Sequence, residues 1–597
     1  MKGFKLIRWR RAAFLLSSAL GFSMQFVSSA PAKPQAQEPV AARANQTYVE
    51  GLEALKNGNL ATARTKFSET VKLVPNNAEA HNSLGWVLLA ESETDSAISH
   101  FRTALRLRPK FVQAHINLAN ALIRKGSAQQ ALAEAREAVR LAPKDSEAHR
   151  TLAHALDFAG ERHAAAEALR AALKLEPSRA ELHDELGSVL MRLSQGEGAE
   201  TEFREAIRIS PELAQAHLHL GVLQYERKAN EAAIQELETA TRLAPENPET
   251  FYFLGLAYRN QNESEKAISA MENSAKLQPD QANILNELGL LLQHNGRPEE
   301  AASAYKEVIR LQPENPDGHN NLGLVLLQTG DAPGAISEFQ SALKLKPADT
   351  GYQTNLGAAY LQRADFVAAA RQFESALRLS PENPTLHYDL GLALKLQDNL
   401  PEAIAEFRKA EALDPKQPDA PYTLGVTLWQ QGDLDNAETE LRTAIRAKPD
   451  YAEAFYTLGT VLKQQGKLQD SATALREALR LQPDFAGAHT TLAAVLRQLG
   501  DTDGAAVESR AGAELAKRKT DLQAAVFATN SGKRLRNAGD LDGAISQFRT
   551  AINAAKDFAP AHYELGLALL AQGKKEEAAR EFEAAKSLDS KLVPPGS

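Results

Sequence analysis

Histidine is the residue whose spacing most suggests chemistry, because nine of the fourteen histidines occupy one position of a 34-residue repeating unit. They are His81, His115, His149, His183, His217, His319, His387, His489 and His562. Imidazole is a common zinc ligand, but a shared zinc ion needs every ligand within about 2 Å. Equivalent positions in adjacent pairs of packed helices lie roughly 10 Å apart. We therefore predict that these histidines pack between helices and that the chain has no metal site.

No known catalytic motif occurs in the chain. The sequence contains no HExxH pair, no phosphate-binding P-loop and no GxSxG elbow, and it has no predicted strand on which such a motif could sit. There is no Cys, which excludes a thiolate nucleophile, a disulfide and a cysteine metal site. We predict that the chain is not an enzyme, has no catalytic residues and requires no cofactor.

Tyrosine marks a candidate binding surface. When the 34-residue unit is counted from Ala44, three consecutive units have Tyr at position 5 and a cation or Trp seven residues later, two helical turns along the same face. With the cation of the next unit, this tyrosine–lysine surface consists of Tyr388, Lys395, Tyr422, Trp429, Tyr456, Lys463 and Arg497. Aromatic rings alternating with cations suit an extended acidic peptide or a free carboxylate. The alternative, that the tyrosines only fill space between repeats, stays open.

A second candidate surface is more apolar and lies earlier in the chain. This apolar patch consists of Leu218, Tyr225, Tyr252, Phe253 and Leu256. The patch falls in the sixth and seventh repeats. We expect it to offer a partner aromatic and aliphatic contacts.

The elements that position these residues are helices. Prolines recur every 34 residues from Pro75 to Pro483, and each unit contains two segments with apolar residues at helical spacing. A Gly often separates the two segments, and the proline at position 32 ends the second. Position 8 is Gly or Ala and position 20 is almost always Ala, so the two helices approach closely. Gly85, Gly323, Ala335 and Pro347 exemplify these structural positions.

The pattern of Leu at 7, Gly or Ala at 8, Ala at 20 and 27, and Pro at 32 resembles the tetratricopeptide repeat (TPR) family. The resemblance covers about 550 residues and implies an all-α, right-handed superhelical solenoid of about sixteen helix-turn-helix units, with first helices lining a concave face. Stretches such as AHINLANALI and GHNNLGLVLL are most similar to the repeat superhelix of O-linked N-acetylglucosamine transferase. The sequence up to Ser597 contains no counterpart of that enzyme's catalytic region.

The N-terminus has the layout of a secretory signal: a basic region, an apolar run from Ala12 to Val27, and a small-residue end at Ala30 to Ala32. Residues 1–32 hold five of the 68 basic residues and no acidic residue. The remaining 63 basic residues stand against 76 acidic ones, a net charge of −13, which argues against nucleic-acid binding. We expect cleavage and export to the periplasm or cell envelope. Retention as a membrane anchor, and Sec or Tat as the export route, stay open.

The register of the repeats divides the chain. The predicted divisions are a signal peptide at 1–32, a linker at 33–43, fourteen repeats in frame at 44–519, a register break at 520–524, two further repeats at 525–592 and a tail at 593–597. Repeat fourteen has Lys517 where proline is expected, and there is no proline from Ala505 to Ser531. We predict a continuous helical connector across the break.

The function predicted from these features is that of an exported, non-enzymatic scaffold that binds protein or peptide segments, acidic or extended, along its groove. Two alternatives stay open: a periplasmic component of polysaccharide secretion or cell-envelope assembly, and the regulatory partner of a separate glycosyltransferase. Self-association through an uncapped C-terminal edge also stays open. Neither nucleic acid nor stable membrane insertion after signal removal is expected.

Overall fold

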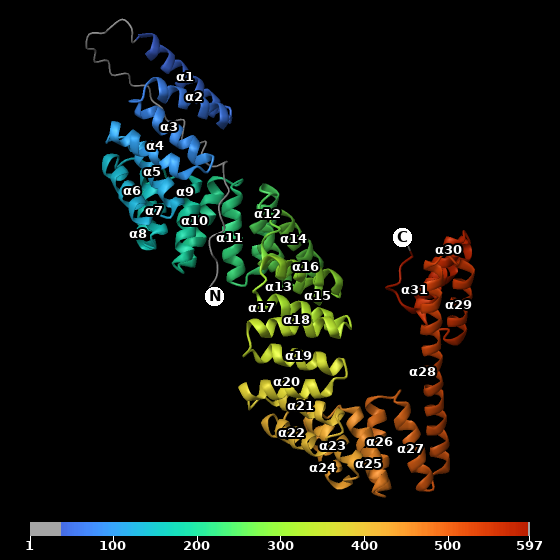
Figure 1. Cartoon of the computed structure of the whole chain (residues 1–597). Coiled ribbons are helices and arrows are strands. Elements are labelled where there is room, and N and C mark those ends of the chain that lie inside the picture. The colour runs from blue at the N-terminus through green and yellow to red at the C-terminus, as the bar shows by residue number, and fades with distance from the viewer. Residues whose placement is uncertain (1–37, 595–597) are drawn as a thin grey trace. The chain divides into compact units, whose positions relative to one another are not determined.

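The computed structural model describes residues 38–594, which form 31 helices and no strand (Figure 1). The helices divide into two compact units, one ending at Leu311 and one beginning at Gln312. The predicted all-α helical solenoid is confirmed. The predicted signal peptide lies outside the described residues.

The first unit contains sixteen helices. They are α1 (Glu38–Lys56), α2 (Leu60–Leu73), α3 (Ala78–Ala90), α4 (Thr94–Leu107), α5 (Val112–Lys125), α6 (Ala128–Leu141), α7 (Ser146–Phe158), α8 (Arg162–Leu175), α9 (Ala180–Arg192), α10 (Gly196–Ile209), α11 (Ala214–Glu226), α12 (Asn230–Leu243), α13 (Pro248–Asn260), α14 (Ser264–Leu277), α15 (Ala282–His294) and α16 (Pro298–Leu311).

The second unit contains the remaining fifteen helices. They are α17 (Pro316–Gln328), α18 (Ala332–Leu345), α19 (Thr350–Gln362), α20 (Phe366–Leu379), α21 (Pro384–Leu396), α22 (Leu400–Leu413), α23 (Asp419–Gln431), α24 (Leu434–Ala447), α25 (Ala452–Gln464), α26 (Leu468–Leu481), α27 (Ala486–Gln498), α28 (Thr502–Asn537), α29 (Leu541–Ala554), α30 (Ala559–Ala571) and α31 (Lys575–Leu588).

Most repeats are antiparallel helix pairs in which a glycine of the first helix faces a large side chain of the second. In α17, a Cβ added to Gly323 would lie 2.6 Å from the ring of Phe339 on α18, which is fully buried. The same contact recurs between Gly85 and Phe101. Where position 8 is Ala119, position 24 carries the small residue Ala135, so the volume at this contact is balanced within the repeat.

The turn inside each pair ends the first helix in a left-handed conformation. Gly126 and Gly432 adopt φ of 85°, which glycine tolerates without strain. The position is also left-handed where it is not glycine, as at Lys228 (φ 62°) and Ala364 (φ 61°). The tertiary packing of the pair therefore imposes the turn, and glycine only makes it easier.

The N-terminal end of the array differs from the predicted division. Residues 38–43 were expected to belong to a linker, but α1 begins at Glu38, so this part of the prediction is wrong. The run from Val40 to Ala44 has good helix formers, and Pro39 lies in the first turn, where it costs no hydrogen bond.

Farther on, α28 runs as one 36-residue helix through residues 520–524, where the sequence predicts a continuous connector.

The histidines at position 4 join consecutive repeats. In α11, His217 faces the carboxylate of Glu236 through Nδ1 (2.6 Å) and the carbonyl of Pro211 through Nε2 (3.0 Å). Six further histidines have both contacts: His115, His183, His319, His387, His489 and His562. Both partners only accept hydrogen bonds, so each ring satisfies them fully when both nitrogens carry a proton.

The two other histidines at position 4 have different contacts. His81 lies 2.9 Å from His100 through Nδ1 and 3.1 Å from the carbonyl of Pro75 through Nε2, and His149 lies 3.0 Å from the carbonyl of Pro143 through Nε2. Within residues 38–594, no three side chains of His, Asp or Glu converge as ligands for a metal ion.

The glycine contact predicts a stability effect. Gly323→Ala should destabilise the α17–α18 pair by about 1 to 3 kcal/mol, because the ring of Phe339 must move. The double change Gly323→Ala with Phe339→Leu should recover part of this loss, since it copies the pairing of Ala153 with Leu169 in an earlier repeat. Hydrogen exchange of α17 and α18 is the appropriate measurement, since repeat arrays need not unfold as one unit. Equal exchange in wild type and Gly323→Ala would contradict the packing.

The imidazolium contacts predict a pH effect. The hydrogen bond to Glu236 raises the pKa of His217, while burial and the charge of Arg242 oppose the rise. A raised folded-state pKa stabilises the fold fully below the unfolded value, and this stabilisation is lost as pH rises through the folded value. Hydrogen exchange in α11 and α12 should therefore quicken as pH rises above about 6.5, after correction for intrinsic exchange.

The matched variant for this effect is Glu236→Gln, which removes the anion and keeps the shape. Its α11–α12 protection should be lower near pH 6 and should change less with pH. A pH profile that is identical in both proteins would show that the carboxylate does not hold the proton on His217.

Candidate functional site

The first helices of the repeats form one layer of each unit. In the second unit α21, α23, α25 and α27 are first helices, and α23 contacts α25 and α25 contacts α27 in addition to their own partners. Positions 5, 9 and 12 of these four helices are partly or fully exposed. The tyrosine–lysine surface lies on this layer, and all of its residues belong to the second unit.

The tyrosines of this surface are partly buried and pack on other rings. Tyr422 lies 4.8 Å from the ring of Tyr451, and Tyr456 lies 4.7 Å from the ring of Phe485, both as ring-centroid distances. Tyr388 packs on Phe407 at 5.8 Å and its hydroxyl lies 3.3 Å from that of Thr423. The tyrosines therefore fill space between repeats and also present an edge to the groove.

The sequence analysis did not name Tyr451 and Phe485, the aromatic partners of these tyrosines. Both stand at position 34, the last residue before the next first helix. These rings could have been found from the sequence, because position 34 of other repeats holds an Asp or Asn that caps the following helix, as at Asp145, Asn247 and Asn383.

The cations of the surface are not neutralised by the protein. Lys395 and Lys463 are partly buried, Arg497 is exposed, and within residues 38–594 no hydrogen bond or ion pair involves their charged groups. Burial lowers the pKa of Lys395. Trp429 donates a hydrogen bond from Nε1 to Gln464 (2.9 Å), which holds the indole along the groove.

Asp389 is an additional residue of this surface that sequence reasoning missed. It occupies position 6 of α21, is partly buried, and in the described chain has no cation or hydrogen-bond donor at its carboxylate. Burial raises its pKa to about 6. The inner face of α21 thus carries an acceptor, Asp389, and a donor, Lys395, both available to a ligand.

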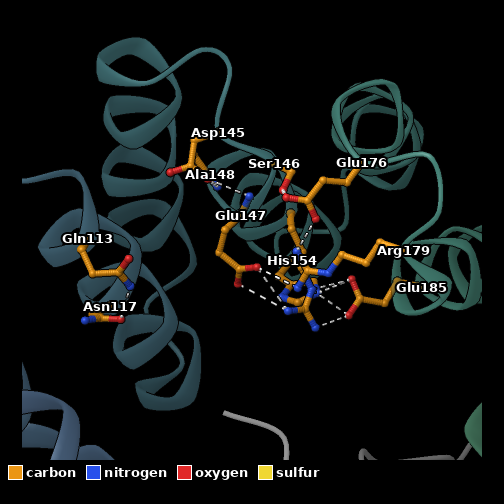
Figure 2. A network of polar contacts seen from close by, with 11 residues as sticks. Gln113, Asn117, Asp145, Ser146, Glu147, Ala148, His154, Glu176, Arg179 and Glu185 are labelled. Carbon is orange, nitrogen blue, oxygen red and sulfur yellow. Dashed lines mark hydrogen bonds and ion pairs between the residues drawn. The ribbon is translucent and has the colours of Figure 1, made fainter. Parts of the chain in front are cut away.

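The corresponding layer of the first unit is different, because its charged groups bind one another. Figure 2 shows this network around Glu185, whose carboxylate accepts hydrogen bonds from Arg150 (2.5 Å) and His154 (3.0 Å). Arg150 and Arg179 also contact Glu147. Burial raises the pKa of Glu185, but the charges of His154 and Arg150 outweigh this and hold it below its usual range. This closed network leaves few free groups for a partner.

The apolar patch is smaller than predicted. Leu218 and Leu256 are buried beneath the surface, at 1% and 6% exposure, so their assignment to a surface patch is wrong. Tyr225, Phe253 and Tyr252 are partly exposed and contact one another, with ring centroids 6.1 and 5.4 Å apart. Burial of position 5 is not a general feature of the first unit, because Tyr252 at position 5 of α13 is partly exposed.

Known family models match most of the chain. The model described as "Tetratricopeptide repeat" matches residues 48–110, 150–214, 185–248, 252–316, 287–350, 354–418, 456–518 and 529–592, and a second model of the same description matches 88–155 and 394–460. The chain belongs to the tetratricopeptide-repeat family. This family assignment supports protein–protein interaction as the general role, and no enzyme family is indicated.

Solved TPR structures resemble the chain at low identity. The Cut9–Hcn1 hetero-tetramer of the APC/C is 14% identical over 78% of this chain and 99% of that chain, with a TM-score of 0.34. YrrB, described as a TPR protein with an unusual peptide-binding site, is 21% identical over 30% and 94%, with a TM-score of 0.29. MamA from Desulfovibrio magneticus RS-1 is 25% identical over 28% and 96%, with a TM-score of 0.28. Among curated protein sequences, none matches.

Within the TPR array, no helix among residues 38–594 combines the length and the apolar character needed to cross a membrane. The longest helix, α28, carries charged residues on both sides of residues 522–532.

The raised pKa of Asp389 predicts that replacing its carboxyl group stabilises the fold by an amount that depends on pH. A carboxyl group with a raised folded-state pKa stabilises the fold only while it is protonated, and this contribution is lost as pH rises through about 6. Asp389→Asn should therefore stabilise α21 near pH 8 by an amount of the order of 2 kcal/mol and have little effect near pH 4. Thermal melting and exchange of α21 at both pH values provide the measurement. A stability loss near pH 8 would show that the carboxylate has a favourable partner.

Proposed function

We propose that this TPR protein is an exported, non-catalytic scaffold whose tyrosine–lysine surface binds an extended, acidic peptide segment of a partner protein. The observation that carries the proposal is the set of unneutralised groups on one concave face: Lys395, Lys463 and Arg497 for carboxylates, and Asp389 for a backbone N–H. Export rests on the signal-like N-terminus.

The chemistry of the surface explains why an extended ligand fits. The cations stand at position 12 of α21, α25 and α27, with Trp429 at the same position of α23, and these positions lie about 10 Å apart per repeat step. An extended peptide spans about 3.3 Å per residue, so carboxylates roughly three residues apart can meet Lys463 and Arg497, and one roughly six residues farther along can meet Lys395. The exposed edges of Tyr422 and Trp429 supply flat apolar contact between the charged points.

The amount of affinity expected from any one cation is small, because partly exposed ion pairs contribute about 0 to 1 kcal/mol and are screened by salt. Several such contacts along one chain add up when a single ligand makes them together. Binding should therefore be distributed along the groove and should weaken strongly as ionic strength rises.

The experiment uses selection of short random peptides on the immobilised chain. Wild-type protein should enrich Asp- and Glu-rich extended sequences, and the triple variant Lys395→Gln, Lys463→Gln, Arg497→Gln should lose most of this capture while melting unchanged. These side chains are better probes than Tyr422→Ala with Tyr456→Ala, whose rings also support Tyr451 and Phe485.

The matched control is Arg378→Gln, Lys416→Gln, Arg476→Gln, which removes three exposed cations outside the tyrosine–lysine surface. It should keep peptide capture. Selection of sequences without acidic residues, or equal losses in both triple variants, would overturn the proposed site.

A further inference from the structure

The helix α28 leaves open a face that every neighbouring first helix buries. In the second unit, six other first helices follow a complete repeat. The residue at position 3 of each is buried: Tyr352, Leu386, Ala420, Ala454, Ala488 and Ala561. Each lies on a helix that contacts the second helix of the preceding repeat, as α29 contacts α30. In the C-terminal half of α28 the same position is Phe527, which is 71% exposed.

The reason is the continuity of α28. Because α28 runs without a turn from repeat fourteen into repeat fifteen (Figure 1), repeat fourteen supplies no separate second helix to pack against the C-terminal half of α28. The opposite side packs normally, with Ala525, Ala528 and Gly532 buried toward α29 and α30. Repeat fifteen therefore lacks the preceding second helix that covers position 3 of the first helix in the other repeats.

The open face combines apolar and basic side chains. Leu522 and Val526 are exposed one helical turn apart, and Phe527 adjoins them. Lys519 stands two turns before Val526, and Arg534 stands two turns after Phe527. Both cations are exposed, and neither has an ion pair within the described residues.

The charge around this face contrasts with the rest of the protein. Residues 513–537 carry six basic and two acidic residues, whereas the whole chain has 68 basic and 76 acidic residues. Arg518, Lys533 and Arg536 are bound to Asp557 and Glu564, so Lys517, Lys519 and Arg534 remain to attract a ligand.

We infer that the open face of α28, formed by Leu522, Val526 and Phe527 with Lys519 and Arg534, binds an acidic amphipathic helix of a partner protein. The helix takes the place that a second helix holds in the other repeats. Its apolar stripe covers Phe527, and its acidic residues meet the two cations. This site is separate from the tyrosine–lysine surface, which takes an extended ligand.

The probe is a fluorescent peptide with the sequence of α10, Gly196–Ile209, held helical by a staple on its polar face, since free helices of this length are unstable in water. In this chain α10 is itself a second helix packed on α11, and it has four Glu and two Arg. Fluorescence anisotropy with the full chain should show binding that weakens with salt. The same peptide with its glutamates replaced by glutamine should bind more weakly.

Two variants and one control locate the binding. Phe527→Ala should weaken binding about tenfold or more, as loss of a central aromatic contact does, and Lys519→Glu with Arg534→Glu should remove its salt dependence. Val507→Ala is the control, because Val507 is also exposed on α28 (61%) but lies in the half that belongs to repeat fourteen. Phe527 is exposed, so its removal should leave thermal melting unchanged.

Three results would overturn the inference. The peptide fails to bind wild type, or Phe527→Ala and Val507→Ala bind it alike. Alternatively, the chain binds phosphatidylglycerol vesicles through Phe527 in place of the peptide, which would make the face a membrane contact. Finally, sedimentation shows a dimer that is abolished by Phe527→Ala but is not displaced by the peptide. That result would make a second copy of the chain the occupant of the face.

Discussion

The close approach of two helices at a glycine is the contact on which the rest of the structure depends. Gly323 has no side chain, so the ring of Phe339 can lie directly against the backbone of α17. That contact sets the distance between the helices of a pair. Because the same contact recurs in most repeats, the pairs have nearly the same geometry and stack in one register. Consecutive first helices then form a common layer on which side chains of distant repeats lie in sequence order.

Once this layer exists, its chemistry depends on which charges are left without partners. In the first unit, Arg150, His154 and Glu185 bind one another. Their charges are already paired, so they are not available to a ligand. In the second unit, Lys395 and Asp389 share a helix without meeting each other or another charged group. Charges held partly buried and unpaired cost free energy, and a ligand that pairs with them recovers it. The two units are therefore built alike and differ in what they can bind.

The histidines at position 4 and the helix α28 show two ways in which one repeat is joined to the next. Seven of these histidines bridge a carboxylate of their own repeat and a carbonyl at the end of the preceding one, so the joint is polar. At α28 the joint is a helix backbone, which keeps repeats fourteen and fifteen connected while leaving the side of Phe527 uncovered. The interruption of the repeat thus creates a surface that the regular array does not have.

The sequence alone determined the fold class and the presence of two helices in each repeat. It could do so because each of these depends on residues within about 34 positions of one another, and because sixteen copies repeat the same signal. Even the continuous helix α28 follows from local information, the missing proline near Lys517. The linker at residues 38–43 was misjudged because proline at a helix start resembles proline in a loop.

Only the tertiary structure decided which side chains are available. Leu218 and Tyr388 both stand at position 5, yet Leu218 is buried and Tyr388 is partly exposed, because burial depends on the neighbours from adjacent helices. The same holds for Asp389, whose lack of a partner cannot be seen in the sequence, and for Phe527, whose exposure follows from a helix that is not there. Periodicity specifies how a repeat folds, whereas the pairing of its charges and the covering of its apolar groups depend on contacts between repeats.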